Sequence, residues 1–215
     1  MADQTPITEL FVKIQSWARD HAPEVAFRPP AAPATLDNFS EKSGLALPED
    51  LQRVWQVADG ETRKSAGMIG NWRLMPIAEI QAAWGLLTKI AEKGGFAGRE
   101  PQASPYLQPA WWHASWIPVA ASDTGHYFCI ATDPPEKDRA GQILLFLQDR
   151  QERPLVAGSL RAWFDRIASD LAAGLYAYDP EDGFNGEGFM WSSLEGKHIF
   201  DDFGGTLMVK DAKQS

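Results

Sequence analysis

The sequence predicts an α+β fold in which an antiparallel sheet, a meander of about four to six strands, packs against helices. Two observations support this prediction. Between residues 116 and 150, three apolar segments are separated by short turns, and short turns make neighbouring strands antiparallel. On both sides of this stretch, apolar residues recur with the spacing of amphipathic helices. At 215 residues, the chain can bury a sizeable core without a disulfide.

The central strands are expected at residues 116–121, 126–132 and 142–148, and shorter strands at residues 72–75 and 155–156. The third central strand contains five consecutive apolar residues, and successive residues of a strand point to opposite faces of the sheet. Both faces are therefore apolar at this strand. Either the chain itself covers both of them, as at an ordinary central strand, or part of one face is left for a partner.

Helices are expected where apolar residues recur every three or four positions. These segments are residues 7–21, 35–43, 47–60, 77–91 and 160–171. Thr35 and Ser159 are the expected N-caps of the second and fifth helices. Gly44 and Gly60 are the expected ends of the second and third helices.

Residues 1–175 are expected to form one domain, made of helix 7–21, a proline-rich connector at residues 22–34 and a core at residues 35–175. The acidic, aromatic C-terminal extension, residues 176–215, is expected to pack on the same domain because its large apolar residues need burial. Those residues are Phe184, Phe189, Met190, Trp191, Phe200 and Phe203. We expect this extension to cover the second apolar face of the sheet.

The segment 93–115 is expected to be a long loop, since it has three glycines, three prolines and no helical or strand period. Long loops carry function disproportionately, and tryptophan concentrates binding energy when it is desolvated. Trp111 and Trp112 therefore either contact a partner or fold back over the core. The candidate binding residues are Trp72, Trp111, Trp112, His113, Trp116, Asp123 and Asp133.

The formal net charge of −9 argues against nucleic-acid binding, which depends on clustered lysine and arginine. Residues 176–215 hold eight acidic and three basic groups, so they contribute −5 of this charge. The balance is compatible with a basic protein partner. The first residues lack the features of a signal peptide, and no apolar run is long enough to span a membrane. We therefore expect a cytoplasmic protein that does not bind membranes.

No catalytic residue, metal or cofactor is predicted. His126 precedes Cys129 by three positions in a strand, so the two side chains point to opposite faces and Cys129 is expected to be buried and structural. Ser159 lacks the second glycine of a nucleophile elbow. The four histidines have no metal-ligand spacing, and Phe184 occupies the position where a calcium loop needs glycine. A single cysteine excludes an internal disulfide.

The order of several short motifs is more specific than any one of them. They are Leu47-Pro48, Asp59-Gly60, the helix start at 76–80, the strand at 116–120, Gly125, Asp133-Pro134, the segment 141–143 and Ser159. This succession resembles the SUKH superfamily, named partly for a fungal cell-wall assembly regulator, over roughly residues 35–175.

The resemblance implies an α+β domain that binds other proteins and carries no catalytic residues. Bacterial members often serve as immunity proteins that neutralise polymorphic toxins, and fungal members are regulatory scaffolds. The leading expectation is therefore a non-enzymatic protein-binding domain of the immunity type, and a regulatory or scaffolding role is the alternative. A basic toxin domain would be the partner of an immunity protein. The alternative from another class is an enzyme whose site assembles only in three dimensions, from His113, His126 or Asp123. The sequence does not predict an oligomeric state.

Overall fold

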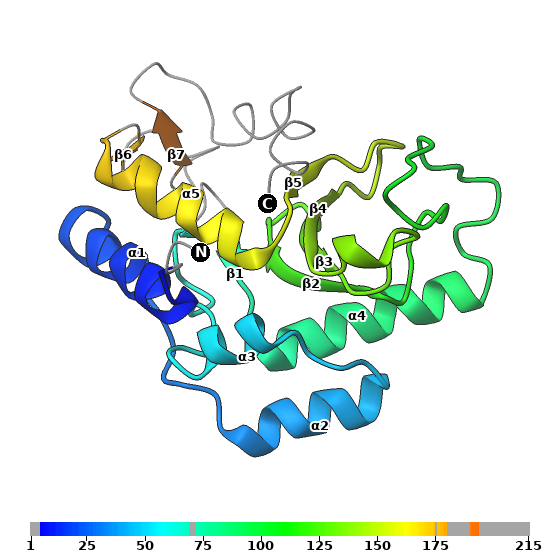
Figure 1. Cartoon of the computed structure of the whole chain (residues 1–215), viewed down its shortest axis with the longest axis horizontal. Coiled ribbons are helices and arrows are strands. Elements are labelled where there is room, and N and C mark those ends of the chain that lie inside the picture. The colour runs from blue at the N-terminus through cyan, green and yellow to red at the C-terminus, as the bar shows by residue number, and fades with distance from the viewer. Residues whose placement is uncertain (1–4, 69–71, 175, 180–189, 194–215) are drawn as a thin grey trace.

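The computed structural model describes residues 5–68, 72–174, 176–179 and 190–193, and its centre is a five-stranded antiparallel sheet (Figure 1). The strands follow one another in chain order across the sheet, as predicted for a meander. They are β1 (Arg73–Leu74), β2 (Trp116–Ala121), β3 (Tyr127–Ala131), β4 (Gln142–Phe146) and β5 (Leu155–Ala157).

Helices flank the sheet, so the α+β prediction is confirmed. They are α1 (Ile7–His21), α2 (Pro33–Ser43), α3 (Glu49–Trp55), α4 (Ile77–Glu92), α5 (Leu160–Ala172) and the short 3₁₀ helix η1 (Lys137–Arg139). Helix α1 packs along α5, and α4 runs along the sheet beside β2 and also contacts α2 (Figure 1).

Two predicted helix boundaries are wrong. Helix α2 begins at Pro33, before the expected cap Thr35. The N–H groups of a first helical turn have no acceptor within the helix, so proline, which lacks an N–H, is well tolerated there. Helix α3 ends at Trp55, well before the expected end at Gly60. Gly60 lies instead in a turn with φ +64°, where an added Cβ would be only 2.5 Å from the carbonyl carbon of Met75. That glycine allows two backbone segments to approach each other.

Two predicted caps are confirmed. Gly44 follows α2 in the left-handed conformation, with φ 68°. Ser159 precedes α5, and its hydroxyl oxygen accepts a hydrogen bond of 3.1 Å from the backbone N–H of Ala162.

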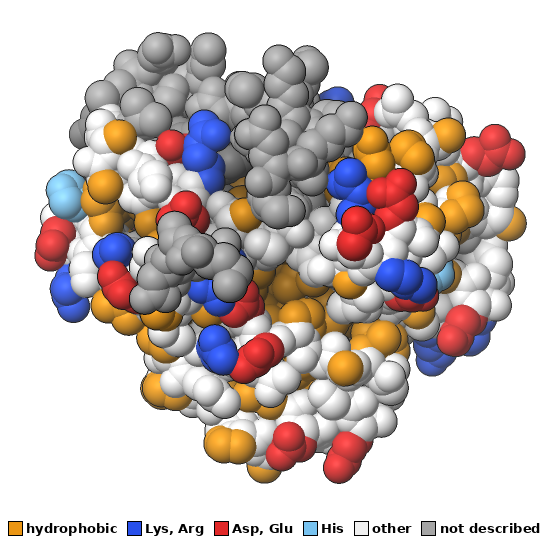
Figure 2. Space-filling model, in the orientation of Figure 1, with side chains coloured by type: hydrophobic (Ala, Val, Ile, Leu, Met, Phe, Trp, Pro, Cys, Tyr) orange, Lys and Arg blue, Asp and Glu red, His pale blue; other side chains and the backbone are white. Residues whose placement is uncertain are grey.

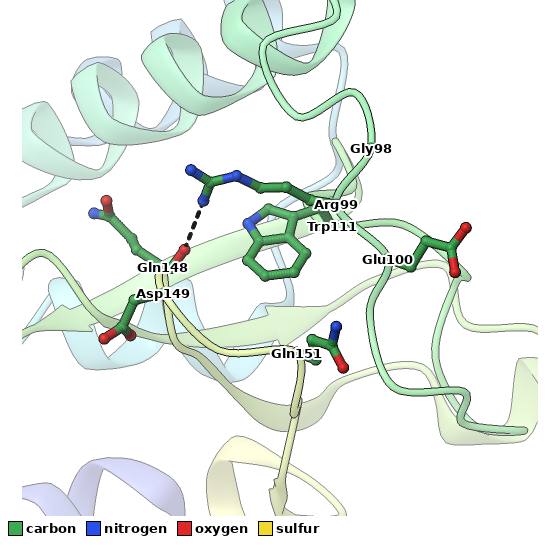
Figure 3. A pocket seen from close by; sticks show the side chains of 7 residues that line it. All are labelled: Gly98, Arg99, Glu100, Trp111, Gln148, Asp149 and Gln151. Atoms are coloured by element: carbon green, nitrogen blue, oxygen red, sulfur yellow. Dashed lines mark hydrogen bonds between the residues drawn. The ribbon is translucent and has the colours of Figure 1, made fainter.

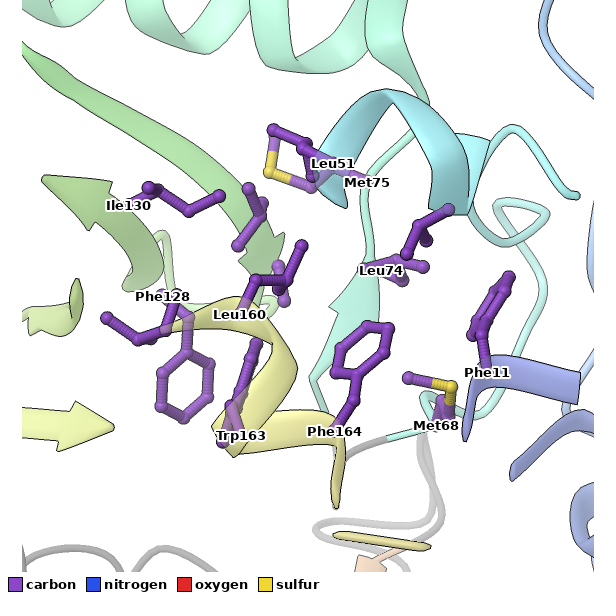
Figure 4. Close-up of a cluster of buried hydrophobic side chains, with 14 of the residues drawn as sticks. Phe11, Leu51, Met68, Leu74, Met75, Phe128, Ile130, Leu160, Trp163 and Phe164 are labelled. Atoms are coloured by element: carbon purple, nitrogen blue, oxygen red, sulfur yellow. The ribbon is translucent and has the colours of Figure 1, made fainter. Parts of the chain in front are cut away.

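One face of the sheet, which we call the helical face, is closed mainly by α1, α3 and α5, with buried residues of α2 and of the first turn of α4 in the same core. Ile143 and Leu145 of β4 belong to this core. Figure 4 shows Phe128 of β3 beside Trp163 and Phe164 of α5, and the rings of Phe128 and Trp163 have centroids 4.8 Å apart. The apolar stripe that predicted helix α5 therefore forms the centre of the main core.

The other face, which we call the loop face, is closed by the C-terminal half of α4 and by the loop 93–115. Leu144 and Phe146 of β4 pack there against Trp111, Trp112 and other apolar residues. Those others are Leu87, Leu107, Trp116, Cys129, Ala131 and Leu155. The chain itself thus covers both faces of β4. Among the described residues, the cover that we expected from the C-terminal extension comes from this loop.

The described parts of the extension form a separate hairpin of β6 (Tyr176–Asp179) and β7 (Met190–Ser193). The strands are antiparallel, and the sequence analysis did not predict them. Phe184, Phe189, Phe200 and Phe203 lie outside the described residues. The boundary at residue 175 and the packing of the whole extension on the domain stay predictions.

Candidate functional site

The loop 93–115 is fixed to the β4–β5 turn by hydrogen bonds. Arg99 Nη1 donates to the carbonyl oxygen of Gln148 over 3.1 Å, and the N–H of Gln102 donates to that of Gln151 over 2.8 Å. At the other end of the loop, the indole N–H of Trp84 in α4 donates to a backbone carbonyl over 2.7 Å. A segment without regular structure is thereby held in one arrangement against the sheet.

The four candidate tryptophans are buried in the described structure. The solvent-exposed fraction of the residue is 4% for Trp72, 7% for Trp111, 3% for Trp112 and 1% for Trp116. Trp112 packs edge-on against Trp116 at a centroid distance of 5.9 Å, whereas Trp72 lies on the helical face against Phe128 at 4.6 Å. Of the two readings given for Trp111 and Trp112, this geometry favours the core role. A partner at this surface would contact the loop around the rings rather than their faces.

A pocket of about 570 Å³ opens between the loop 93–115 and the β4–β5 turn, a size within the range of small-ligand sites (Figure 3). We call it the Arg99 pocket. It is lined by Gly98, Arg99, Glu100, Trp111, Gln148, Asp149 and Gln151. Figure 3 shows the guanidinium of Arg99 reaching over the Trp111 indole toward the carbonyl of Gln148.

A buried arginine supports the wall of this pocket. The guanidinium carbon of Arg153 lies 4.7 Å from the ring centroid of Trp111 and 4.6 Å from that of Phe146. Its N–H groups donate to the backbone carbonyls of Trp111, Arg150 and Glu152. Burial lowers the pKa of Arg153 to about 10, although it stays charged at neutral pH. Within the described structure, Arg153 Nε and Trp111 Nε1 are buried without a hydrogen-bond partner.

His113 and Asp133 lie at one end of β2 and β3. His113 Nδ1 accepts a 3.2 Å hydrogen bond from the N–H of Ser115 and is 2.7 Å from the Ser115 hydroxyl. Burial lowers the pKa of His113, and the nearby Asp133 carboxylate partly opposes that effect. Asp133 is exposed and accepts a hydrogen bond from Lys137, which lowers the pKa of Asp133. Asp123 is exposed in the β2–β3 turn, at the opposite end of these antiparallel strands.

His126 directly precedes β3, at the same end as Asp123 and beside the Arg99 pocket. Its Nδ1 accepts a 3.2 Å hydrogen bond from the N–H of Gln148, and its Nε2 is 3.8 Å from a carboxylate oxygen of Asp149. Burial lowers the pKa of His126, and the Asp149 carboxylate partly opposes that effect. His113 lies at the far end of the strands, so the three residues of the enzyme alternative do not meet in one site.

Cys129 is fully buried, and burial raises the pKa of its thiol well above the ordinary value, so the prediction of a structural cysteine is confirmed. The described residues contain no group of three or more histidine, cysteine or carboxylate side chains that could hold a metal ion. Across that same part of the chain, no helix has the length and apolar character needed to cross a membrane.

Sequence reasoning named Trp111 but missed the other residues of the Arg99 pocket. Arg99 and Gln148, which line the pocket, and Arg153, which lies against the Trp111 ring, are single polar residues in segments that carry no motif. Their meeting depends on two loops about 50 residues apart in the chain, as the Arg99–Gln148 contact shows. The one available signal was the pair of tryptophans in the loop 93–115.

The comparisons with known proteins identify relatives among fungal regulators. A protein of Schizosaccharomyces pombe named "Cell wall biosynthesis/cell cycle regulator smi1" is 26% identical over 83% of this chain and 37% of its own length. A "Glucan synthesis regulatory protein" of Neurospora crassa is 24% identical over 79% of this chain and 39% of its own. "Cell wall assembly regulator SMI1" of Saccharomyces cerevisiae is 20% identical over 81% of this chain and 43% of its own.

The chain thus spans about two fifths of the length of these curated relatives. The family model described as SMI1 / KNR4 family (SUKH-1) matches residues 30–166, which include β1 to β5 and α2 to α4. This match covers more than half of the chain and the whole loop face. The chain belongs to the SMI1/KNR4 (SUKH-1) family.

Proposed function

We propose that this chain is a non-enzymatic protein-binding domain with a regulatory or scaffolding role. The similarity to relatives that are named as regulators of the cell wall or of glucan synthesis, over 79–83% of this chain, carries the proposal. We place the binding surface on the loop face, where two loops meet over a core of tryptophans. A binding surface held rigidly loses less conformational entropy on association than a flexible one.

The charge distribution is consistent with a protein partner. Figure 2 shows acidic and basic side chains interspersed over the visible surface, without a large patch of a single sign. Such a surface can make specific polar contacts at the rim of a protein interface. A cytoplasmic location fits this role.

A second candidate is an immunity protein that neutralises a toxin, which the SUKH family also includes. The net charge of −9 supports this candidate, because an acidic protein attracts a basic toxin domain. Association would then weaken as the salt concentration rises.

Affinity capture tests the proposal. A tagged chain is expressed in the organism that encodes it, and cross-linked proteins are identified by mass spectrometry. Each candidate is then purified and titrated into the chain by calorimetry. An unrelated acidic protein with a net charge near −9 serves as the control for non-specific attraction.

We expect one candidate to form a stoichiometric complex with the chain and not with the control. A partner that functions in cell-wall or glucan synthesis supports the regulatory role. A toxic partner whose effect on growth is relieved by co-expression of the chain supports immunity. Failure of every purified candidate to bind, or equal binding to the control protein, contradicts protein binding as the function.

A further inference from the structure

We infer that the Arg99 pocket binds a peptide carboxylate, carried by an aspartate or glutamate side chain or by a chain terminus. The inference rests on the proposed protein-binding function and specifies the chemical group that this surface recognises. The observations behind it are the two arginines on the Trp111 indole and the polar hydrogens that lack acceptors.

The first argument is the charge beneath the pocket. Arg153 is 7% exposed, and its three hydrogen bonds all go to neutral backbone carbonyls. Arg153 forms no ion pair within the part of the chain that the structure describes. A buried cation without a counter-ion is costly, and its field acts through a medium of low dielectric constant. An anion that enters the pocket would relieve this imbalance.

The second argument is the set of available donors. Trp111 lines the pocket, is 7% exposed, and its buried indole N–H has no acceptor among the described residues. The guanidinium carbon of Arg99 lies 5.3 Å from the indole centroid, and its one hydrogen bond recorded in the described structure uses Nη1 alone. Arg99 is exposed, so its side chain can shift to let a ligand approach the indole. A carboxylate could then accept hydrogen bonds from the Trp111 indole N–H and from the Arg99 guanidinium. Hydrogen bonds between arginine and a carboxylate are charge-assisted and therefore strong.

The acidic residues at the pocket do not reverse its preference for an anionic ligand. Glu100 is exposed, and the Asp149 side chain keeps 71% of its exposed area, so water and salt screen both charges. The charge of Arg153 is screened much less because it is buried. Exposed carboxylates at the rim can accept hydrogen bonds from the N–H groups beside a peptide carboxylate, and this favours a peptide over a compact anion such as phosphate.

The negative net charge of the whole chain does not exclude an acidic ligand. The extension 176–215 contributes −5 of the −9, which leaves −4 for the first 175 residues. At physiological ionic strength the screening length is about 8 Å, so charges far from the pocket contribute little to binding there.

Nuclear magnetic resonance of the full chain tests the inference, because the side-chain N–H resonance of Trp111 reports directly on the pocket. Three acetylated tripeptides are titrated: Gly-Glu-Gly amide, Gly-Gly-Gly with a free carboxylate, and the neutral Gly-Gln-Gly amide. The variant Trp111→Phe assigns the indole resonance. Arg99→Gln tests the site while keeping an N–H group that can donate to the Gln148 carbonyl, and Arg19→Gln, at an exposed position of α1, is the matched control.

We expect at least one carboxylate peptide to shift the Trp111 resonance saturably and to bind at least tenfold more tightly than the neutral peptide. Arg99→Gln should weaken that binding about tenfold, the effect of losing one charge-assisted bond, while Arg19→Gln should leave it unchanged. Whichever of the two carboxylate peptides binds more tightly identifies the source as a side chain or a chain terminus.

Equal affinity for the neutral peptide, no saturable shift with either carboxylate, or equal affinities of the two arginine variants would overturn the inference. A partner protein that binds the chain although the peptides do not would refute the carboxylate site and leave the proposed function intact. If no purified candidate partner formed a complex with the chain, the result would count against the proposed function itself.

Discussion

The two faces of the sheet are closed in different ways. The helical face is covered by α1, α3 and α5, whose apolar stripes interlock in a sealed core. The loop face is covered largely by an irregular segment, with a cation among aromatic rings and a pocket at its margin. Regular helices satisfy their own backbone groups, whereas a loop needs partners for them. The face closed by a loop is therefore the face that can offer polar groups to a ligand.

The treatment of buried charge shows the same contrast. Beside β1, Glu61 is fully buried, and its carboxylate oxygens accept hydrogen bonds from Ser65 and from the N–H groups of Met68 and Leu74. Its acceptors are thus used to join a loop to β1. On the loop face, Arg153 keeps an unpaired N–H and has carbonyl partners only. One buried ionisable group organises the fold, and the other is left for interaction.

The largest expected effect is the loss of stability when a tryptophan of the sealed core, rather than one beside the pocket, is replaced by alanine. Trp163→Ala should lower the free energy of unfolding by about 3–5 kcal/mol, because the cavity left behind is closed and apolar. Trp111→Ala should cost at least about 1 kcal/mol less, since water from the adjoining pocket can fill the space. Urea denaturation of both variants measures the difference. Equal losses would contradict the distinction between the faces.

The next effect concerns Glu61. Glu61→Ala should destabilise the protein by about 2–4 kcal/mol, since it leaves the buried N–H groups of Met68 and Leu74 without an acceptor. Glu61→Gln is the matched control: its amide oxygen can accept from the same two groups, and its NH₂ can donate to the Ser65 hydroxyl. The free energies of unfolding come from denaturant titration. If the two variants were equally unstable, shape rather than hydrogen bonding would explain the role of Glu61.

Helix α5 and the meander could be predicted from local sequence patterns, whereas the end of α3 could not. The stripe containing Trp163 repeats every three or four residues, so local periodicity predicted α5 and its place in the core. Family motifs and short turns likewise predicted the meander. The wrong end assigned to α3 came from reading Gly60 as a helix terminus, although that glycine serves a contact with Met75 that is distant in sequence.

The pocket and the hairpin could not be predicted because they depend on non-local pairing. Arg153 is a charged residue in a turn, where exposure is the ordinary expectation, and its burial follows from the fold that brings Trp111 and Phe146 to it. Strands β6 and β7 occur in a glycine-rich stretch without alternation, so their pairing has no local signal.

A smaller effect should appear as a dependence of stability on pH. Burial raises the pKa of Glu61 from 4.5 to about 7, while its hydrogen bonds and Arg73 oppose this shift. The folded state then binds the Glu61 proton more tightly than the unfolded state does, so stability from this group is greatest below pH 4.5 and declines as the pH rises to about 7. We expect the wild type to lose about 2 kcal/mol between pH 5 and 8 relative to Glu61→Gln.

Denaturation at a series of pH values measures this loss, and the comparison with Glu61→Gln removes the contributions of His113 and His126, whose pKa values burial lowers. An identical pH profile for the two proteins would mean that the folded structure does not disfavour the Glu61 carboxylate.

Hydrogen exchange of the complex with a captured partner tests the central claim most directly, namely that the loop face is the binding surface. Mass spectrometry would compare the backbone amides of the free and bound chain. We predict slower exchange in the bound chain at residues 98–102 and 148–151, which border the Arg99 pocket, and no change along α1 and α5. Slowed exchange confined to α1 and α5, with the loop face unaffected, would contradict the account.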